Sequence, residues 1–332
     1  MRPQGGRVSA ARRLRETAMK TADLTTLCGY ASALPTPFED GRIDADAFAA
    51  FCHWQIEQGI SAVVVNGTTG EAPTLTRDEQ NRLVALALEV AEGQVPVIAG
   101  AGSNSTLHAI EIARDAQKAG AGGLLAVTPY YNKPSQEGLF RHFRAIHDAT
   151  DLPILLYDVP ARTGCTLALD TIGRLAELPR IVGLKDATGD LARPGNLRRM
   201  LGEGFRLLSG DDGTALDFLA LGGDGCISVL SNVAPKLCNR LYLASACGEQ
   251  VEARLIERKL RPLVAALFAE SNPVPVKWAL GLMGRMSPEV RLPLCEPGES
   301  TRASVRKALA QLGLVGPHGL VRSAVRVMSL CG

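Results

Sequence analysis

Eight short apolar runs follow one another along the chain, and amphipathic segments separate them. The runs span Ala31–Leu34, Ala62–Val65, Val95–Ala99, Leu124–Val127, Ile154–Tyr157, Ile181–Leu184, Arg206–Leu208 and Cys226–Val229. Between them, apolar side chains recur at the spacing of one helix face, as at Leu83, Leu86 and Val90. Short buried strands that alternate with amphipathic helices are typical of an α/β fold, and eight repeats predict a (β/α)8 TIM barrel. The competing doubly wound open sheet normally brings a Gly-x-Gly-x-x-Gly turn after the first strand, and the sequence has none there.

The barrel pattern occupies residues 27–231, and the segments on either side of it differ in composition. Residues 1–26 are rich in arginine, poor in acids and without an apolar segment, so they do not resemble a secretory signal. They fit either an organelle transit peptide or sequence ahead of a true start at Met19; we favour the second and expect a poorly ordered leader. Residues 232–315 predict a C-terminal helical appendage, and the tail at 316–332 gives no firm signal.

The composition argues against several classes of protein. The 332 residues carry a formal net charge of +2, so we expect neither nucleic acid nor a membrane surface as a partner. Eight cysteines without a Cys-x-x-Cys pair indicate reduced thiols and a cytoplasmic protein. Five histidines occur without a His-x-His or His-Glu-x-x-His spacing, so we expect no metal site.

Lys185 is the one polar residue that ends the sixth apolar run, and a turn follows it. Side chains alternate along a strand, so Ile181, Gly183 and Lys185 are expected on one face and Val182 and Leu184 on the other. If the second face packs under helices, Lys185 points into the barrel, and Gly183 leaves space beside it. The amine is then either a salt-bridged cation or the nucleophile of a Schiff base. A nucleophile would need a pKa lowered by roughly three units from about 10.4.

Polar residues also follow other predicted strands, at the end of the barrel where active sites form. The turn from Gly67 to Gly70 offers backbone N–H groups and the hydroxyls of Thr68 and Thr69 to a carboxylate. Tyr157 has the parity of an inward-pointing residue one strand away from Lys185, where a phenol can pass protons to an amine. Arg162 on the following loop can form a fork with a carboxylate. Each feature alone is ordinary packing or an ordinary turn, but together they predict a Schiff-base site.

Several of these motifs, in their order and spacing, resemble the pyruvate-dependent class I aldolase family and, within it, the dihydrodipicolinate synthases. The resemblance covers roughly Cys28 to Leu314. Its motifs are Gly67–Glu71, Tyr130–Pro134, Tyr157–Gly164, Gly183–Gly189, Ser209–Asp212 and Asn272–Lys277.

The resemblance implies a catalytic role for four residues. Lys185 would form the imine with pyruvate, and Tyr157 would shuttle protons to and from it. Thr68 would hydrogen-bond Tyr157 and link it to Tyr131, which in the family reaches in from a neighbouring subunit.

The resemblance also implies four substrate contacts. Thr69 would hold the pyruvate carboxylate, and the backbone of Ile227 would lie beside the bound pyruvate. Arg162 would hold the carboxylate of aspartate semialdehyde, with the carbonyl of Gly210 nearby.

The activity that the resemblance implies is condensation of pyruvate with L-aspartate 4-semialdehyde to 4-hydroxy-tetrahydrodipicolinate, in lysine and diaminopimelate biosynthesis. It implies no metal or organic cofactor, and a homotetramer built as a dimer of dimers. Two alternatives stay open. One is a sister enzyme, a sialic acid lyase or keto-deoxy sugar aldolase, which Arg162 disfavours because such enzymes generally lack an arginine there. The other is a non-catalytic paralogue, which the intact set of site residues disfavours.

Overall fold

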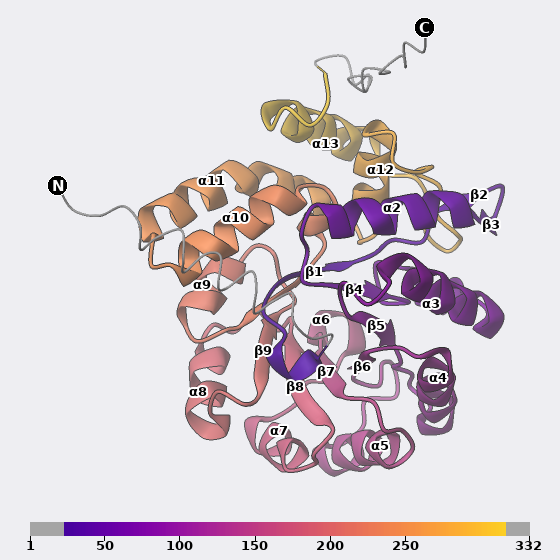
Figure 1. Ribbon diagram of the computed structural model, residues 1–332, viewed down its shortest axis with the longest axis vertical. Helices are drawn as coiled ribbons and strands as arrows, with labels where there is room; N and C mark the ends of the chain where they lie inside the picture. The colour runs from indigo at the N-terminus through magenta and orange to yellow at the C-terminus, as the bar shows by residue number, and fades with distance from the viewer. Residues whose placement is uncertain (1–22, 317–332) are drawn as a thin grey trace, which may run out of the picture.

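The computed structural model describes residues 23–316, and within them eight parallel strands close into a barrel (Figure 1). The strands are β1 (Gly29–Ala33), β4 (Ala62–Val65), β5 (Val97–Gly100), β6 (Gly123–Val127), β7 (Ile154–Asp158), β8 (Ile181–Asp186), β9 (Arg206–Ser209) and β10 (Gly225–Ser228). Each strand pairs with its neighbours in sequence order, and β1 closes the ring by pairing with both β4 and β10. The predicted TIM barrel is therefore confirmed.

Helices follow the strands and surround the barrel, as the amphipathic pattern predicted. They are α2 (Ala45–Glu57), α3 (Arg77–Ala91), α4 (Thr106–Ala119), α5 (Gln136–Asp148), α6 (Pro160–Thr163), α7 (Leu169–Ala176), α8 (Ala192–Leu201) and α9 (Ala215–Ala220). A short hairpin of β2 (Phe38–Glu39) and β3 (Arg42–Ile43) precedes α2. A capping box starts α3, where Thr76 and Glu79 exchange side-chain and backbone hydrogen bonds.

Within residues 23–316, four α-helices come after β10, and Figure 1 shows them together on one side of the molecule. They are α10 (Pro235–Ala246), α11 (Gln250–Leu267), α12 (Val274–Leu282) and α13 (Glu299–Gln311). α10 packs against β1 and α11, and α13 packs against α11 and α12. The C-terminal helices are thus present, whereas the division of the chain at 231 stays a prediction.

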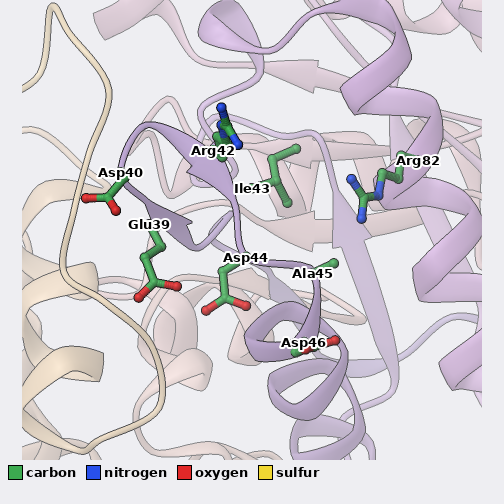
Figure 2. A pocket seen from close by; sticks show the side chains of 8 residues that line it. All are labelled: Glu39, Asp40, Arg42, Ile43, Asp44, Ala45, Asp46 and Arg82. Atoms are coloured by element: carbon green, nitrogen blue, oxygen red, sulfur yellow. The ribbon is translucent and has the colours of Figure 1, made fainter.

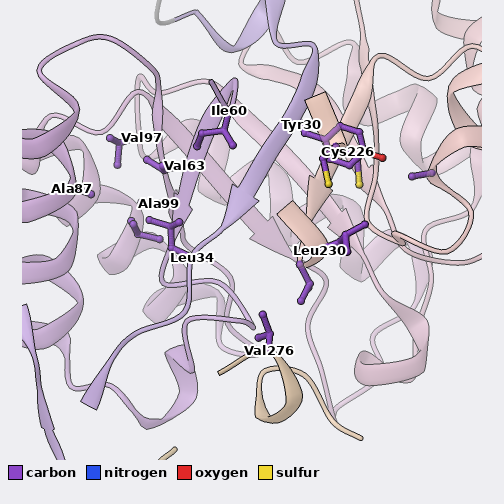
Figure 3. Close-up of a cluster of buried hydrophobic side chains, with 14 of the residues drawn as sticks. Tyr30, Leu34, Ile60, Val63, Ala87, Val97, Ala99, Cys226, Leu230 and Val276 are labelled. Atoms are coloured by element: carbon purple, nitrogen blue, oxygen red, sulfur yellow. The ribbon is translucent and has the colours of Figure 1, made fainter. Parts of the chain in front are cut away.

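The apolar residues form two layers because strand side chains alternate in direction. Leu155 and Tyr157 belong to a cluster inside the barrel, whereas Ile154 and Leu156 belong to the larger cluster between strands and helices. Figure 3 shows part of the larger cluster, where strand side chains such as Val63 meet helix side chains. The alternation sets which strand-end residues face the barrel mouth.

The N-terminal end of the barrel is closed by η1 (Leu24–Thr26), which the sequence had placed in the leader. Leu24 is fully buried and joins the cluster inside the barrel, because an apolar side chain just ahead of β1 fills the barrel floor. The rest of the predicted leader, residues 1–22, and the tail residues 317–332 lie outside the described residues.

The predicted parity of β8 is correct from Gly183 onward and wrong before it. The pairing of β7 with β8 shifts by one residue, so that Ile154 pairs with Ile181 but Leu155 pairs with Gly183. This bulge places Ile181 in the outer cluster and Val182 against the inner one, the reverse of the prediction. Since both residues are apolar, the sequence pattern carried no sign of the shift.

Candidate active site

Lys185 and Tyr157 lie side by side inside the mouth of the barrel. They are paired residues of β8 and β7, and both are almost buried, with 6% and 7% of their surface exposed. The Lys185 Nζ atom lies 4.3 Å from the centroid of the Tyr157 ring. The amine and the phenol that the sequence pattern paired are therefore within side-chain contact, in a place where most water is excluded.

Gly210, at the end of β9, is the residue that leaves space for the Lys185 side chain. A Cβ atom at Gly210 would lie 3.0 Å from the Lys185 Cε atom, and the Gly210 N–H donates to the Asp186 carbonyl at 2.6 Å. The prediction that Gly183 leaves this space is wrong. A Cβ there would lie 2.5 Å from the Arg206 carbonyl oxygen and 2.8 Å from Leu155 Cδ2, so neighbouring strands already fill the position.

The turn after β4 places Thr69 in a buried position. Thr69 is 2% exposed, and its hydroxyl accepts a hydrogen bond of 2.9 Å from Asn272 Nδ2. The Gly70 N–H donates to the Gly67 carbonyl, which closes the turn. Thr68 beside it is partly exposed, and among residues 23–316 its hydroxyl forms no hydrogen bond with Tyr157. The predicted relay from Tyr157 through Thr68 to Tyr131 stays a prediction.

Tyr131 lies on the loop between β6 and α5, and it is 87% exposed. Its backbone has φ of 75°, in the left-handed region that a bulky residue rarely adopts. The side chain of Asn132 ties the loop to the Asn104 carbonyl at 2.9 Å. The loop thus holds a tyrosine away from the rest of its own chain in a defined backbone conformation.

Arg162 on α6 is held by the C-terminal segment of the chain. Its Nη2 atom donates to the carbonyl oxygen of Asn272 at 3.1 Å. Because the Asn272 side chain also donates to Thr69, one residue contacts both predicted carboxylate-binding groups. Sequence reasoning quoted Asn272 only as part of a motif and gave it no role.

A buried ion pair connects the same turn to α12. Lys277 Nζ lies 2.7 Å from Glu71 Oε1, and the two side chains are 0% and 1% exposed. The second Glu71 oxygen accepts from the Arg291 backbone N–H at 2.9 Å. Burial lowers the pKa of Lys277, and the Glu71 carboxylate opposes that shift. This pair, which sequence reasoning missed, fixes the residue that follows the Thr69 turn.

Ile227, the remaining predicted contact, lies on β10 opposite Ala31 and belongs to the inner cluster with Tyr157. The barrel thus presents an amine, a phenol and a buried threonine hydroxyl at its C-terminal end. Among residues 23–316 no group of three or more His, Cys, Asp or Glu side chains is placed to hold a metal ion. Within the same residues, no helix has the length and apolar character needed to cross a bilayer.

A surface hollow beside the β2–β3 hairpin is separate from these residues, and Figure 2 shows its lining. The hollow is lined by Glu39, Asp40, Arg42, Ile43, Asp44, Ala45, Asp46 and Arg82. Carboxylates outnumber guanidinium groups there, so the local field repels an anionic keto acid. Since no predicted site residue lines it, the hollow is not the candidate active site.

The chain matches known proteins over nearly all of its described length. The model of the dihydrodipicolinate synthetase family matches residues 26–312. The 4-hydroxy-tetrahydrodipicolinate synthase of Rhodospirillum centenum is 52% identical over 287 residues, which cover 86% of this chain and 99% of the relative. The enzyme of the same name from Bradyrhizobium diazoefficiens is 48% identical over 291 residues, 88% of this chain and 98% of the relative.

Solved structures agree with these sequence matches. The dihydrodipicolinate synthase of Thermotoga maritima superposes with a TM-score of 0.85 at 43% identity, over 87% of this chain and all of that one. A structure described as the first monomeric dihydrodipicolinate synthase variant gives a TM-score of 0.86 at 42% identity, over 88% of this chain and 98% of that one. With a family model that spans most of its length and relatives that share about half of its residues, the chain belongs to the dihydrodipicolinate synthetase family.

Proposed function

We propose that this protein is a class I, Schiff-base lyase that condenses pyruvate with L-aspartate 4-semialdehyde to 4-hydroxy-tetrahydrodipicolinate, a step of lysine and diaminopimelate biosynthesis. The observation that carries the proposal is the contact between Lys185 and Tyr157 inside the barrel mouth, in a chain of this family. The reaction as proposed needs no metal or organic cofactor.

The chemistry begins at the Lys185 amine, which attacks the C2 carbonyl of pyruvate. The resulting carbinolamine loses water to form an imine, and Tyr157, next to the amine, passes the protons that this exchange requires. Loss of a proton from the pyruvate methyl group gives an enamine, whose carbon attacks the aldehyde of the second substrate. The amino group of that substrate then attacks the imine carbon, so the ring closes and the Lys185 amine is released.

Two carboxylates have to be held during these steps, and the site offers a different group to each. Thr69 and the N–H groups of its turn would hold the pyruvate carboxylate, with the Ile227 backbone alongside. Arg162 would hold the carboxylate of the aldehyde substrate, near the Gly210 carbonyl. The hydrogen bonds that Asn272 makes to Thr69 and Arg162 support this division, since they preorganise both groups before substrate binds.

The proposed assembly is a cytoplasmic homotetramer, a dimer of dimers, with neither nucleic acid nor a membrane as partner. The exposed, strained Tyr131 supports a dimer in which this side chain completes the site of its neighbour and joins Thr68 and Tyr157. One solved structure is described as a monomeric variant, and sedimentation of this protein would measure its own oligomeric state. A stable, fully active monomer would remove the role of Tyr131.

Trapping and turnover assays test the proposal and its alternatives. Borohydride reduction in the presence of pyruvate should add the mass of one reduced pyruvate per chain, and Lys185→Ala should add none. A non-catalytic paralogue gains no mass. Supplying aspartate semialdehyde then separates the synthase from a sugar-acid lyase, because only the synthase consumes pyruvate when this aldehyde is present.

A further inference from the structure

A buried group of charges lies behind the candidate active site, on the outer side of β7 and β8. Asp158 and Asp186 directly follow Tyr157 and Lys185 and are paired across the two strands. Because neighbouring residues of a strand point to opposite faces, these carboxylates point away from the barrel interior. They are 0% and 4% exposed.

Arg193 on α8 bridges the two carboxylates. Its Nε atom donates to Asp186 Oδ2 at 2.7 Å, and its Nη2 atom donates to Asp158 Oδ2 at 2.9 Å. The third nitrogen donates to the Leu167 carbonyl at 3.0 Å. The planar guanidinium can contact all three acceptors at once, which a lysine ammonium on a flexible stem does less well. One side chain thus ties the ends of β7 and β8 to each other and to the loop before α7.

The two carboxylates depend on this arginine. Burial raises the pKa of the Asp158 carboxyl, and the Arg193 guanidinium opposes that rise. Without Arg193, two neighbouring carboxylates would be buried with no cation between them, and like charges at that spacing repel strongly where water is excluded. The strand ends would then separate or one carboxyl would take up a proton.

The backbone connects this group to the reacting side chains. The Asp186 carbonyl accepts from the Gly210 N–H at 2.6 Å, and the Asp158 carbonyl accepts from the Ala187 N–H at 2.9 Å. Gly210 in turn lies against the Lys185 side chain. A displacement of either strand end is therefore passed directly to the amine.

We propose that Arg193 is a positioning residue for the reaction: by bridging Asp158 and Asp186 it fixes the ends of β7 and β8 so that Tyr157 stays in register with Lys185. The inference rests on the proposed function, because it assigns Arg193 to the imine chemistry of this site. Arg193 itself touches no reacting atom.

The experiment compares two arginines of the same helix. Arg193→Met removes the bridge, and Arg198→Met is the matched control. Arg198 is also largely buried and binds Asp224 Oδ2 at 2.7 Å, but Asp224 precedes β10 at the opposite end of the barrel. Both variants lose a buried ion pair, so both should unfold at lower temperature than the wild type.

The readout is exchange of the pyruvate methyl protons for deuterium in heavy water without the aldehyde, measured well below either unfolding midpoint. This exchange needs the imine and a correctly placed proton carrier. We expect Arg193→Met to catalyse deuterium exchange into pyruvate roughly 10- to 100-fold more slowly than the wild type does, which is the effect that a displacement of about 1 Å produces. The exchange rate of Arg198→Met should stay within about twofold of the wild-type rate.

A double variant covers the case in which Arg193→Met does not fold. Asp158→Asn with Arg193→Met removes one of the carboxylates that would be left unpaired, while the bridge is still missing, so we expect it to fold and to exchange slowly. Exchange at the wild-type rate in the folded single or double variant would overturn the inference. If instead the wild type itself forms no trapped adduct with pyruvate, the proposed function fails first, and the two failures are distinguishable.

Discussion

Replacing Gly210 with alanine should disturb the reaction more than it disturbs the fold. The φ angle of Gly210 is outside the left-handed region, so alanine can adopt the backbone conformation without strain. The new Cβ atom, however, would lie 2.8 Å from the Ala187 Cβ atom and 3.0 Å from the Lys185 Cε atom. Ordinary carbon contacts are about 3.5 to 4 Å, so something must move by roughly half an ångström to one ångström.

The Lys185 side chain is flexible and can move away from the new Cβ atom, whereas the contact with Ala187, whose backbone N–H donates to the Asp158 carbonyl, has to be relieved by a small shift of the backbone. Overpacking of this kind costs about 1 to 3 kcal/mol of folding free energy, which lowers the unfolding midpoint by about 2 to 6 °C in a chain of this size. A nucleophile displaced by about 1 Å can lose about 100-fold in rate, equivalent to roughly 2.7 kcal/mol of activation free energy.

The assay is the rate at which borohydride and pyruvate together add mass to the protein, sampled over time by rapid quenching. Gly204→Ala is the matched control, since a Cβ atom at Gly204 meets nothing within 4 Å. We expect a 10- to 100-fold slower adduct in Gly210→Ala and wild-type behaviour in the control. Adduct formation at the wild-type rate together with an unchanged unfolding midpoint would show that Lys185 does not lie against Gly210.

Three further perturbations follow from the contacts of the site and of the helix layer. Lys277→Met should lower the free energy of unfolding by about 3 to 5 kcal/mol, because it leaves Glu71 buried without a cation. The double variant Lys277→Met with Glu71→Gln should recover most of the lost unfolding midpoint. An equal fall in midpoint in both variants would contradict the ion-pair argument. Arg162→Ala should lower kcat/KM for the aldehyde by roughly 10- to 100-fold, because one charge-assisted contact to the aldehyde carboxylate is lost, and should leave the rate of pyruvate adduct formation nearly unchanged. An equal fall in both rates would contradict the assignment of Arg162 to the aldehyde substrate. Burial lowers the pKa of His142 from 6.5 to about 4, so its stability contribution of roughly 3 kcal/mol is complete above pH 6.5 and disappears as the pH falls through 4. His142→Asn should therefore flatten the fall in unfolding midpoint between these two pH values, and an unchanged slope would show that His142 is not the group responsible.

The sequence was sufficient to predict what depends on local pattern. The repeated runs predicted the barrel, and the parity of Tyr157 and Lys185 near their strand ends predicted their contact across one strand pair. The sequence did not predict the bulge beside Val182, because the bulge exchanges the directions of Ile181 and Val182, and two apolar residues look the same in either direction. The sequence also assigned the space beside the Lys185 amine to Gly183, whereas Gly210 provides it. A glycine in a strand indicates a close neighbour, but the sequence does not show which residue that neighbour is.

Contacts between distant segments were beyond prediction from pattern. Asn272 lies 203 residues after Thr69, and Lys277 lies 206 residues after Glu71, yet both pairs are in hydrogen-bond contact. The composition of one segment does not indicate which distant segment it contacts. Sequence periodicity locates the helix that contains Lys277 but not the turn against which that helix packs, because helix packing is decided by side chains from many elements at once.

These long-range contacts connect the C-terminal part of the chain to the candidate active site. Asn272, two residues before α12, supplies the hydrogen-bond donor to Thr69 and the acceptor for Arg162, and Lys277 on α12 supplies the cation for Glu71. A closed barrel alone would still bring Lys185 and Tyr157 together, because β7 and β8 pair without help from these helices. It would leave both proposed carboxylate-binding groups without their supports. The barrel is therefore sufficient for placing the amine, whereas the contacts that hold the two proposed carboxylate-binding groups come from the segment that follows the barrel.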